Sequence, residues 1–103
     1  MGTNKYRVII TPTAYKEIDQ IYNYSSENLY AENAAIELMR KIEEKIQKLK
    51  YAPKIHTEIE KINELKKRYR RIIIKNFVIL YTINEENKIV YVSHIYYGRR
   101  NYF

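Results

Sequence analysis

Two pairs of adjacent arginines are the residues of this chain best suited to bind an anion. Arg70 and Arg71 lie in the stretch KKRYRRIIIK, residues 66–75, which contains six basic residues and no acid. Arg99 and Arg100 lie in the last ten residues, HIYYGRRNYF. A guanidinium group binds phosphate or carboxylate through two parallel hydrogen bonds. Each pair is therefore a candidate clamp for an anionic group. For Arg70 and Arg71, the alternative is that they are solvated charges that protect an edge strand from pairing.

Aromatic residues flank the second arginine pair. Tyr97 and Gly98 precede it, and Tyr102 follows it. Arginine beside stacking rings binds unpaired bases or a phosphate backbone, and the same combination forms hot spots in protein interfaces. Gly98 permits a positive φ, which would let the chain leave the sheet sharply and re-aim both arginines. The sequence leaves both kinds of target open, beside the alternative of a frayed terminus.

His94 is the third candidate for chemistry, because a histidine at this point could serve as a general base. The alternative is a histidine that is only hydrogen-bonded or half exposed. The chain has two histidines and no cysteine, and it contains no zinc-site spacing, no phosphate-binding glycine motif and no nucleophile elbow. We therefore expect no metal, no cofactor and no serine nucleophile.

Two amphipathic helices are predicted ahead of the basic strands. Residues 5–10 alternate in the manner of a strand, and Thr11 followed by Pro12 is typical of a helix start. This first helix extends to about Asn28. In the second helix, apolar residues recur at helical spacing until Pro53 ends the element. These residues are Ala35, Leu38, Met39, Ile42, Ile46 and Leu49.

Three strands are predicted in the last third of the chain, over residues 69–74, 77–83 and 88–97. The first turn falls at Lys75-Asn76, where asparagine tolerates a left-handed backbone. Residues 54–67 fit either a short helix or a surface loop. The order β-α-α-β-β-β predicts one α+β domain over residues 1–103, with a helical hairpin packed on one face of a mainly antiparallel, twisted sheet.

Charge and composition point to an anionic partner. The chain carries 19 Lys and Arg against 12 Asp and Glu, a net charge of +7, and it contains 12 tyrosines. No apolar run approaches the roughly 20 residues of a membrane span, and no signal peptide is recognisable. We expect a cytoplasmic protein that does not bind membranes. The sequence does not decide whether the native chain extends past Phe103.

The whole pattern resembles the RelE/ParE superfamily, the toxins of type II toxin–antitoxin modules. YRVIITPTAYKEIDQIYNYS is similar to the opening strand and proline-started helix of the family, and AENAAIELMRKIEEKIQKLKYAP is similar to its second helix. YRRIIIKNFVILYTINEENKIVYVSHIYYGRRNY is similar to its three-stranded meander with the terminal Gly-Arg-Arg signature. The resemblance covers nearly the whole chain.

This resemblance implies one of two activities. RelE-type members cleave mRNA on the ribosome without metal, whereas ParE-type members poison DNA gyrase without catalysing a reaction. In the first case, Arg70, His94, Arg100 and Tyr102 would be the catalytic residues. In either case, the residues that bind the target or the nucleic acid would be Arg70, Arg71, Tyr97, Arg99, Arg100 and Tyr102.

Two departures from the cleaving branch favour the gyrase branch. Ile72 and Val78 occupy positions where the resemblance places basic residues. A metal-free nuclease needs cations for the charge that develops on phosphorus, so two apolar replacements remove much of that stabilisation. The resemblance also implies an acidic cognate antitoxin and a hetero-oligomer with it, and either DNA gyrase or the ribosome and mRNA as target. Enzyme activity stays open.

Overall fold

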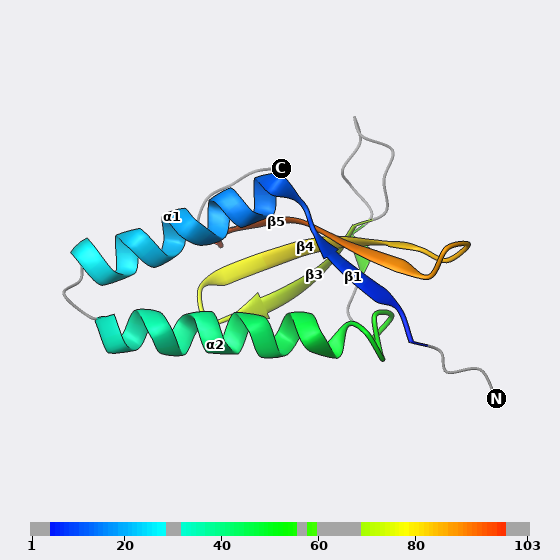
Figure 1. The fold of residues 1–103 in the computed structure, drawn as a ribbon, viewed down its shortest axis with the longest axis horizontal. Coiled ribbons are helices and arrows are strands. Elements are labelled where there is room, and N and C mark those ends of the chain that lie inside the picture. The colour runs from blue at the N-terminus through cyan, green and yellow to red at the C-terminus, as the bar shows by residue number, and fades with distance from the viewer. Residues whose placement is uncertain (1–4, 29–31, 56–57, 60–68, 99–103) are drawn as a thin grey trace.

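The computed structural model describes residues 5–28, 32–55, 58–59 and 69–98 (Figure 1). Its elements are β1 (Arg7–Ile10), α1 (Pro12–Asn28), α2 (Glu32–Lys48), β2 (Glu58–Ile59), β3 (Tyr69–Ile74), β4 (Phe77–Asn84) and β5 (Ile89–Tyr97). This is the predicted order with one two-residue strand added. The prediction of an α+β fold with two helices on one sheet is confirmed.

The strands form one sheet in the order β1-β5-β4-β3-β2. β1 pairs parallel with β5, while β5 with β4, β4 with β3 and β3 with β2 pair antiparallel. Figure 1 shows α1 and α2 lying next to each other against the sheet, with α1 beside β5 and α2 beside β3. We call the covered side the helix face and the opposite side the open face.

Local sequence explains where α1 begins. The Thr11 hydroxyl oxygen accepts a hydrogen bond from the Ala14 amide at 3.2 Å, so Thr11 caps the helix as predicted. Thr11 also holds the helix start to β5, because its amide donates to the Val92 carbonyl at 3.0 Å and its hydroxyl donates to the Ser93 carbonyl at 3.2 Å. One threonine therefore sets both the start and the position of α1.

The apolar stripe of α2 forms one side of the hydrophobic core. Its predicted residues are buried, apart from Met39, which is partly buried. They pack against the helix-face residues of the sheet, which include Ile72, Ile79 and Ile95, each no more than 1 % exposed. Burial of this apolar surface is the main force that holds the helices on the sheet.

The stretch 54–67 is only partly described. Glu58–Ile59 is a strand that pairs with Arg70 and Tyr69 of β3, so at these two positions both the helical and the loop interpretation were wrong. Residues 56–57 and 60–67 lie outside the described part of the chain.

The β3–β4 turn also differs from the prediction. Lys75, with a φ of 52°, adopts the left-handed conformation, whereas Asn76 does not have a positive φ. The hairpin lies where the Lys75-Asn76 dipeptide predicted it. The residue that adopts the sterically unfavourable left-handed backbone, however, is Lys75.

A β-bulge interrupts the pairing of β4 with β5. Leu80 pairs with His94 and Tyr81 pairs with Val92, so Ser93 is an extra residue in β5. A bulge of this kind reverses the alternation of side chains along the strand that carries it. It therefore decides which β5 residues reach the open face.

Candidate target-binding site

The two arginines of β3 point to opposite faces of the sheet. Arg70 pairs with Tyr81, a residue of the main core, and so lies on the helix face. Arg71 pairs with Leu80, lies on the open face and is exposed. Successive residues of a strand alternate between faces, so a strand over this pair must separate its two side chains. The structure thus separates two residues of the predicted binding set.

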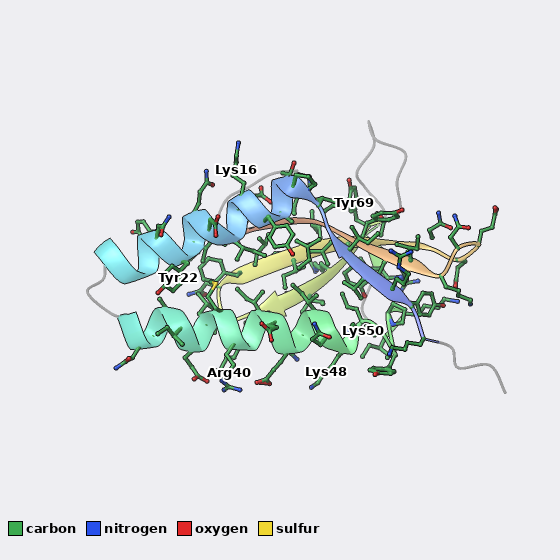
Figure 2. All side chains as sticks on the ribbon, viewed as in Figure 1. Lys16, Tyr22, Arg40, Lys48, Lys50 and Tyr69 are labelled. Atoms are coloured by element: carbon green, nitrogen blue, oxygen red, sulfur yellow. The ribbon has the colours of Figure 1, made fainter. Side chains whose placement is uncertain are left out.

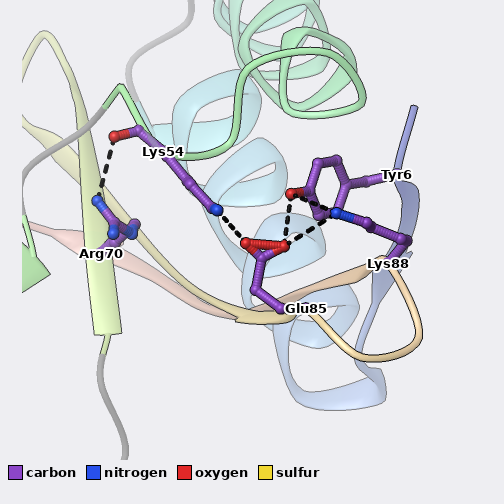
Figure 3. A network of polar contacts seen from close by, with 5 residues as sticks. All are labelled: Tyr6, Lys54, Arg70, Glu85 and Lys88. Atoms are coloured by element: carbon purple, nitrogen blue, oxygen red, sulfur yellow. Dashed lines mark hydrogen bonds and ion pairs between the residues drawn. The ribbon is translucent and has the colours of Figure 1, made fainter. Parts of the chain in front are cut away.

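Arg70 is held at the end of the sheet where α2 finishes. Its guanidinium donates to the Lys54 carbonyl at 3.2 Å (Figure 3). The neighbouring Tyr81 is fully buried, and its hydroxyl donates to the Pro53 carbonyl at 2.5 Å. Burial raises the pKa of Tyr81 to about 12, while the charge of Arg70 acts in the opposite direction. Arg70 thus lies beside a structural contact between the sheet and the segment that follows α2.

A polar network continues from this point to the start of β1. The carboxylate of Glu85 forms an ion pair with Lys54 and accepts a hydrogen bond from the Tyr6 hydroxyl at 2.6 Å (Figure 3). Lys88 Nζ lies 3.4 Å from the same carboxylate and 3.5 Å from the Tyr6 hydroxyl. The hydrogen bonds from Lys54 and Tyr6 lower the pKa of Glu85 to about 2.

The open face carries a small apolar cluster of its own. Tyr69, Val78, Leu80 and Tyr96 form it, and each is between 3 % and 9 % exposed. Beside this cluster, Ile73 is 60 % exposed on the same face of β3 as Arg71. The described open side of the central strands therefore holds a buried apolar and aromatic cluster, beside which Ile73 and Arg71 are exposed.

His94 lies on the open face at the edge of β5 that β1 does not cover. Its Nδ1 is 3.4 Å from the Glu17 carboxylate of α1. The same oxygen of Glu17 accepts a hydrogen bond from the Ile95 amide at 2.9 Å. Glu17 thus satisfies a backbone donor beyond the end of the β1–β5 ladder and orients the imidazole. His94 is half exposed and paired, which are the features of the second interpretation, and its use as a general base stays a prediction.

Tyr97 lies on the helix face. It pairs with Phe77, and the two rings meet edge to face with centroids 5.5 Å apart. Tyr96, which was not part of the predicted binding set, is the one of these two neighbouring tyrosines that lies on the open face. Tyr69 was missed in the same way. Their signal in the sequence was the unbroken apolar run from Phe77 to Tyr81 in β4, which is typical of a strand that is buried on both faces.

Gly98 does not have a positive φ, so the predicted reason for this glycine was wrong. Its amide donates to the Asn76 carbonyl at 2.5 Å, which extends the β4–β5 pairing by one residue. A Cβ on Gly98 would lie 3.0 Å from that oxygen and 3.3 Å from a methyl carbon of Val78. Glycine is needed here for close approach. Arg99, Arg100 and Tyr102 lie outside the described residues.

The two positions that depart from the RNA-cleaving branch are buried. Ile72 is 1 % exposed and belongs to the main core, while Val78 is 9 % exposed in the open-face cluster.

Among the described residues, no three His, Cys, Asp or Glu side chains lie close enough together to hold a metal ion. Within the same described ranges, no helix combines the length and the apolar character needed to cross a membrane.

Comparison with known proteins identifies the family. The model described as "ParE toxin of type II toxin-antitoxin system, parDE" matches residues 8–102. The chromosomal ParDE TA system from P. aeruginosa superposes with a TM-score of 0.72 at 15% sequence identity, covering 92% of this chain and 98% of that chain. The archaeal RelE-RelB complex from Pyrococcus horikoshii OT3 gives a TM-score of 0.64 at 16% identity, covering 94% and 99%.

The toxin-antitoxin complex RelBE2 from Mycobacterium tuberculosis is a third structure of this fold, with a TM-score of 0.54 at 13% identity and coverage of 90% of this chain and 91% of that chain. No curated protein matches the sequence. The predicted resemblance to the RelE/ParE superfamily is confirmed. Because the family model extends over nearly the whole chain, this protein belongs to the ParE toxin family of type II toxin–antitoxin systems.

Proposed function

We propose that this toxin arrests growth by binding and poisoning DNA gyrase and that it does not cleave RNA. The observation that carries the proposal is the burial of Ile72 and Val78. An RNA-cleaving relative would need cations at these positions to stabilise the charge of the pentavalent phosphate. Two buried hydrocarbon side chains supply none, so the positions contribute to folding rather than to catalysis.

The open face is the surface that we assign to the target. On it, Ile73 and Arg71 are exposed beside the buried cluster of Tyr69 and Tyr96, and an arginine next to an exposed apolar side chain is typical of protein-binding surfaces. Arg99, Arg100 and Tyr102 remain predicted contributors, because they follow β5 directly in the sequence. A protein target such as gyrase fits an exposed isoleucine beside a single arginine better than a nucleic acid does.

We further propose that a cognate antitoxin neutralises the protein. The three solved relatives are described as a ParDE system, a RelE-RelB complex and a RelBE2 toxin-antitoxin complex. The net charge of +7 supports an acidic partner. A short acidic open reading frame adjoining this gene is therefore expected.

Ribosome-dependent cleavage of mRNA is the second candidate. It is favoured by one observation, the contact between His94 Nδ1 and the Glu17 carboxylate. A carboxylate that holds one ring nitrogen leaves the other free to act as a general base. In that case Arg70, Arg100 and Tyr102 would complete the site. Arg70 on the helix face argues against this arrangement.

Purified toxin in two parallel assays tests the proposal. With gyrase, DNA and ATP, we expect inhibition of supercoiling and accumulation of linear DNA after detergent treatment. With translating ribosomes, we expect no codon-phased cuts in the mRNA. Cleavage of mRNA by the toxin, with supercoiling unaffected, would contradict the proposal and support the second candidate. The inhibition of gyrase should disappear when the cognate antitoxin is added first.

A further inference from the structure

A second basic surface lies where α2 ends, beside the β4–β5 turn and at the opposite end of β4 from Gly98. We propose that it binds single-stranded nucleic acid directly, as an activity separate from gyrase binding. Four exposed residues define this lysine patch: Lys5, Tyr51, Lys54 and Lys88. They come from the start of β1, the turn after α2 and the end of the β4–β5 turn. No sequence motif predicted their meeting.

The contacts in this region make the patch continuous. Lys5 Nζ lies 5.9 Å from the centroid of the Tyr51 ring. The backbone joins the same two segments, because the Tyr6 amide donates to the Lys50 carbonyl at 2.8 Å. Lys88 Nζ lies 5.0 Å from the centroid of the Tyr6 ring. One surface therefore runs from Tyr51 across β1 to Lys88.

A shared acid holds two of the lysines at a fixed spacing. Lys54 and Lys88 both contact the Glu85 carboxylate, which the Tyr6 hydroxyl also binds (Figure 3). Glu86, the next residue of the turn, is also exposed. Lys54 and Lys88 have side chains that are 58% and 51% exposed, so the ammonium groups reach solvent in spite of the ion pairs. With Lys5, the three lysines of the patch outnumber Glu85 and Glu86 by one, and this excess positive charge is available to a phosphate backbone.

The exposed ring of Tyr51 favours single-stranded over double-stranded nucleic acid as the ligand. Tyr51 is 68% exposed, and Ile55, four residues further on, is 72% exposed. An accessible aromatic ring flanked by cations offers an unpaired base a place to stack while the lysines contact its phosphates. A base paired inside a duplex does not present its face in this way. An acidic peptide would use the lysines but would leave Tyr51 without a role.

The patch is well separated from other basic residues that can serve as controls. Lys16 projects from α1 on the opposite side of the view from Lys48 and Lys50 of the α2 end (Figure 2). Tyr15, beside it, is 58% exposed, close to the exposure of Tyr51. Tyr15 and Lys16 therefore provide a tyrosine and a lysine of similar environment outside the patch.

Fluorescence anisotropy with a labelled dT15 oligonucleotide tests the proposal across a series of salt concentrations. We expect Tyr51→Ala to weaken binding on the order of tenfold through the lost base stack. The charge variant Lys5→Gln/Lys54→Gln should flatten the dependence of log K on log salt by about 1.4, or about 0.7 per lost phosphate contact. Tyr15→Ala and Lys16→Gln/Lys41→Gln, where Lys41 is a partly exposed residue in the middle of α2, match these variants in type and net charge. They should bind within about twofold of wild type, and circular dichroism checks folding of all variants.

Three outcomes would overturn the proposal. The first is no binding of dT15 by the wild-type toxin at low salt. The second is wild-type binding by both patch variants combined with loss of binding in Arg99→Gln/Arg100→Gln. The third is tighter binding of a labelled 15-residue polyglutamate than of dT15, which would assign the patch to an acidic protein. None of these binding assays uses gyrase or ribosomes, so their results test this proposal independently of the proposed function.

Discussion

The Gly98 amide donates to the Asn76 carbonyl, 2.5 Å away, so the end of β5 is fixed to the β3–β4 turn. This contact brings the backbone at Gly98 so close to Asn76 and Val78 that no side chain fits without movement. The described part of β5 therefore ends at a defined point, and the terminal arginine pair follows it directly in the sequence.

Gly98→Ala should destabilise the protein by about 1–3 kcal/mol, because the new methyl group would lie 3.0 Å from the Asn76 oxygen and 3.3 Å from Val78. Urea unfolding measures the change. In a Val78→Ala background one of the two close contacts is removed, so the cost of Gly98→Ala should be smaller there. An equal cost in both backgrounds would show that the Val78 contact is not responsible.

Thr11→Ala should cost about 1 kcal/mol of stability, since the Ala14 amide loses its cap and the hydroxyl no longer reaches the Ser93 carbonyl. Thr11→Ser keeps the hydroxyl and should lose much less. Thr13→Ala, an exposed substitution of the same type in the first turn of α1, is the matched control for thermal unfolding. A control variant as unstable as Thr11→Ala would contradict the capping role.

Tyr81→Phe should cost about 1–3 kcal/mol, because it leaves the Pro53 carbonyl without its buried donor. The variant should also change the response to alkali. The raised pKa of Tyr81, about 12 against an ordinary 10.0, means that its stabilising effect is complete below pH 10 and disappears as the pH rises through 12. Urea midpoints between pH 8 and 11 should fall less steeply in Tyr81→Phe than in wild type, whereas exposed Tyr15→Phe should follow wild type.

Glu85→Gln should remove part of the sensitivity to acid. Since its pKa is lowered to about 2 from 4.5, ionised Glu85 stabilises the fold fully above pH 4.5, and this effect is lost as the pH falls toward 2. Urea midpoints between pH 6 and 3 should therefore fall more in wild type than in Glu85→Gln. Glu86→Gln in the same turn is the control, and it should behave as wild type does.

His94→Gln separates the two candidate functions in cells. If gyrase is the target, growth arrest after induction should remain within a few-fold of wild type, since glutamine can still hydrogen-bond Glu17 and no proton transfer is required. General-base catalysis would instead lose about 10²- to 10⁴-fold in rate. Colony counts after induction, with equal toxin levels verified, distinguish these results. Abolished toxicity in a folded variant would count against the gyrase proposal.

Most of the secondary structure could be predicted because its signals are local. Thr11-Pro12 begins α1 as predicted, and both helices and the three long strands lie within a few residues of their expected bounds. Apolar residues that recur every 3.6 residues indicate a helix, and those that recur every 2 residues indicate a strand. Both patterns can be recognised within one segment, without knowledge of the rest of the chain. The short β2 strand was missed, because its two residues depend on β3 for their hydrogen bonds.

The candidate site was less predictable, because its members come together through contacts distant in sequence. Glu17 meets His94 and the Ile95 amide only because β1 pairs parallel with β5 and carries α1 against that edge. The lysine patch likewise depends on β1, the end of α2 and the β4–β5 turn converging. No local pattern specifies such a meeting.

The sequence by itself determined the helices, the strands, the separation of Arg70 from Arg71 and the family. Only the tertiary structure decided which face each residue of β5 occupies. Strict alternation from Val92 would have placed Tyr97 on the open face and Tyr96 among the core residues. The extra residue at Ser93 reverses that order, because a bulge shifts every later side chain by one position and its location is set by pairing with Leu80 and Tyr81 of another strand.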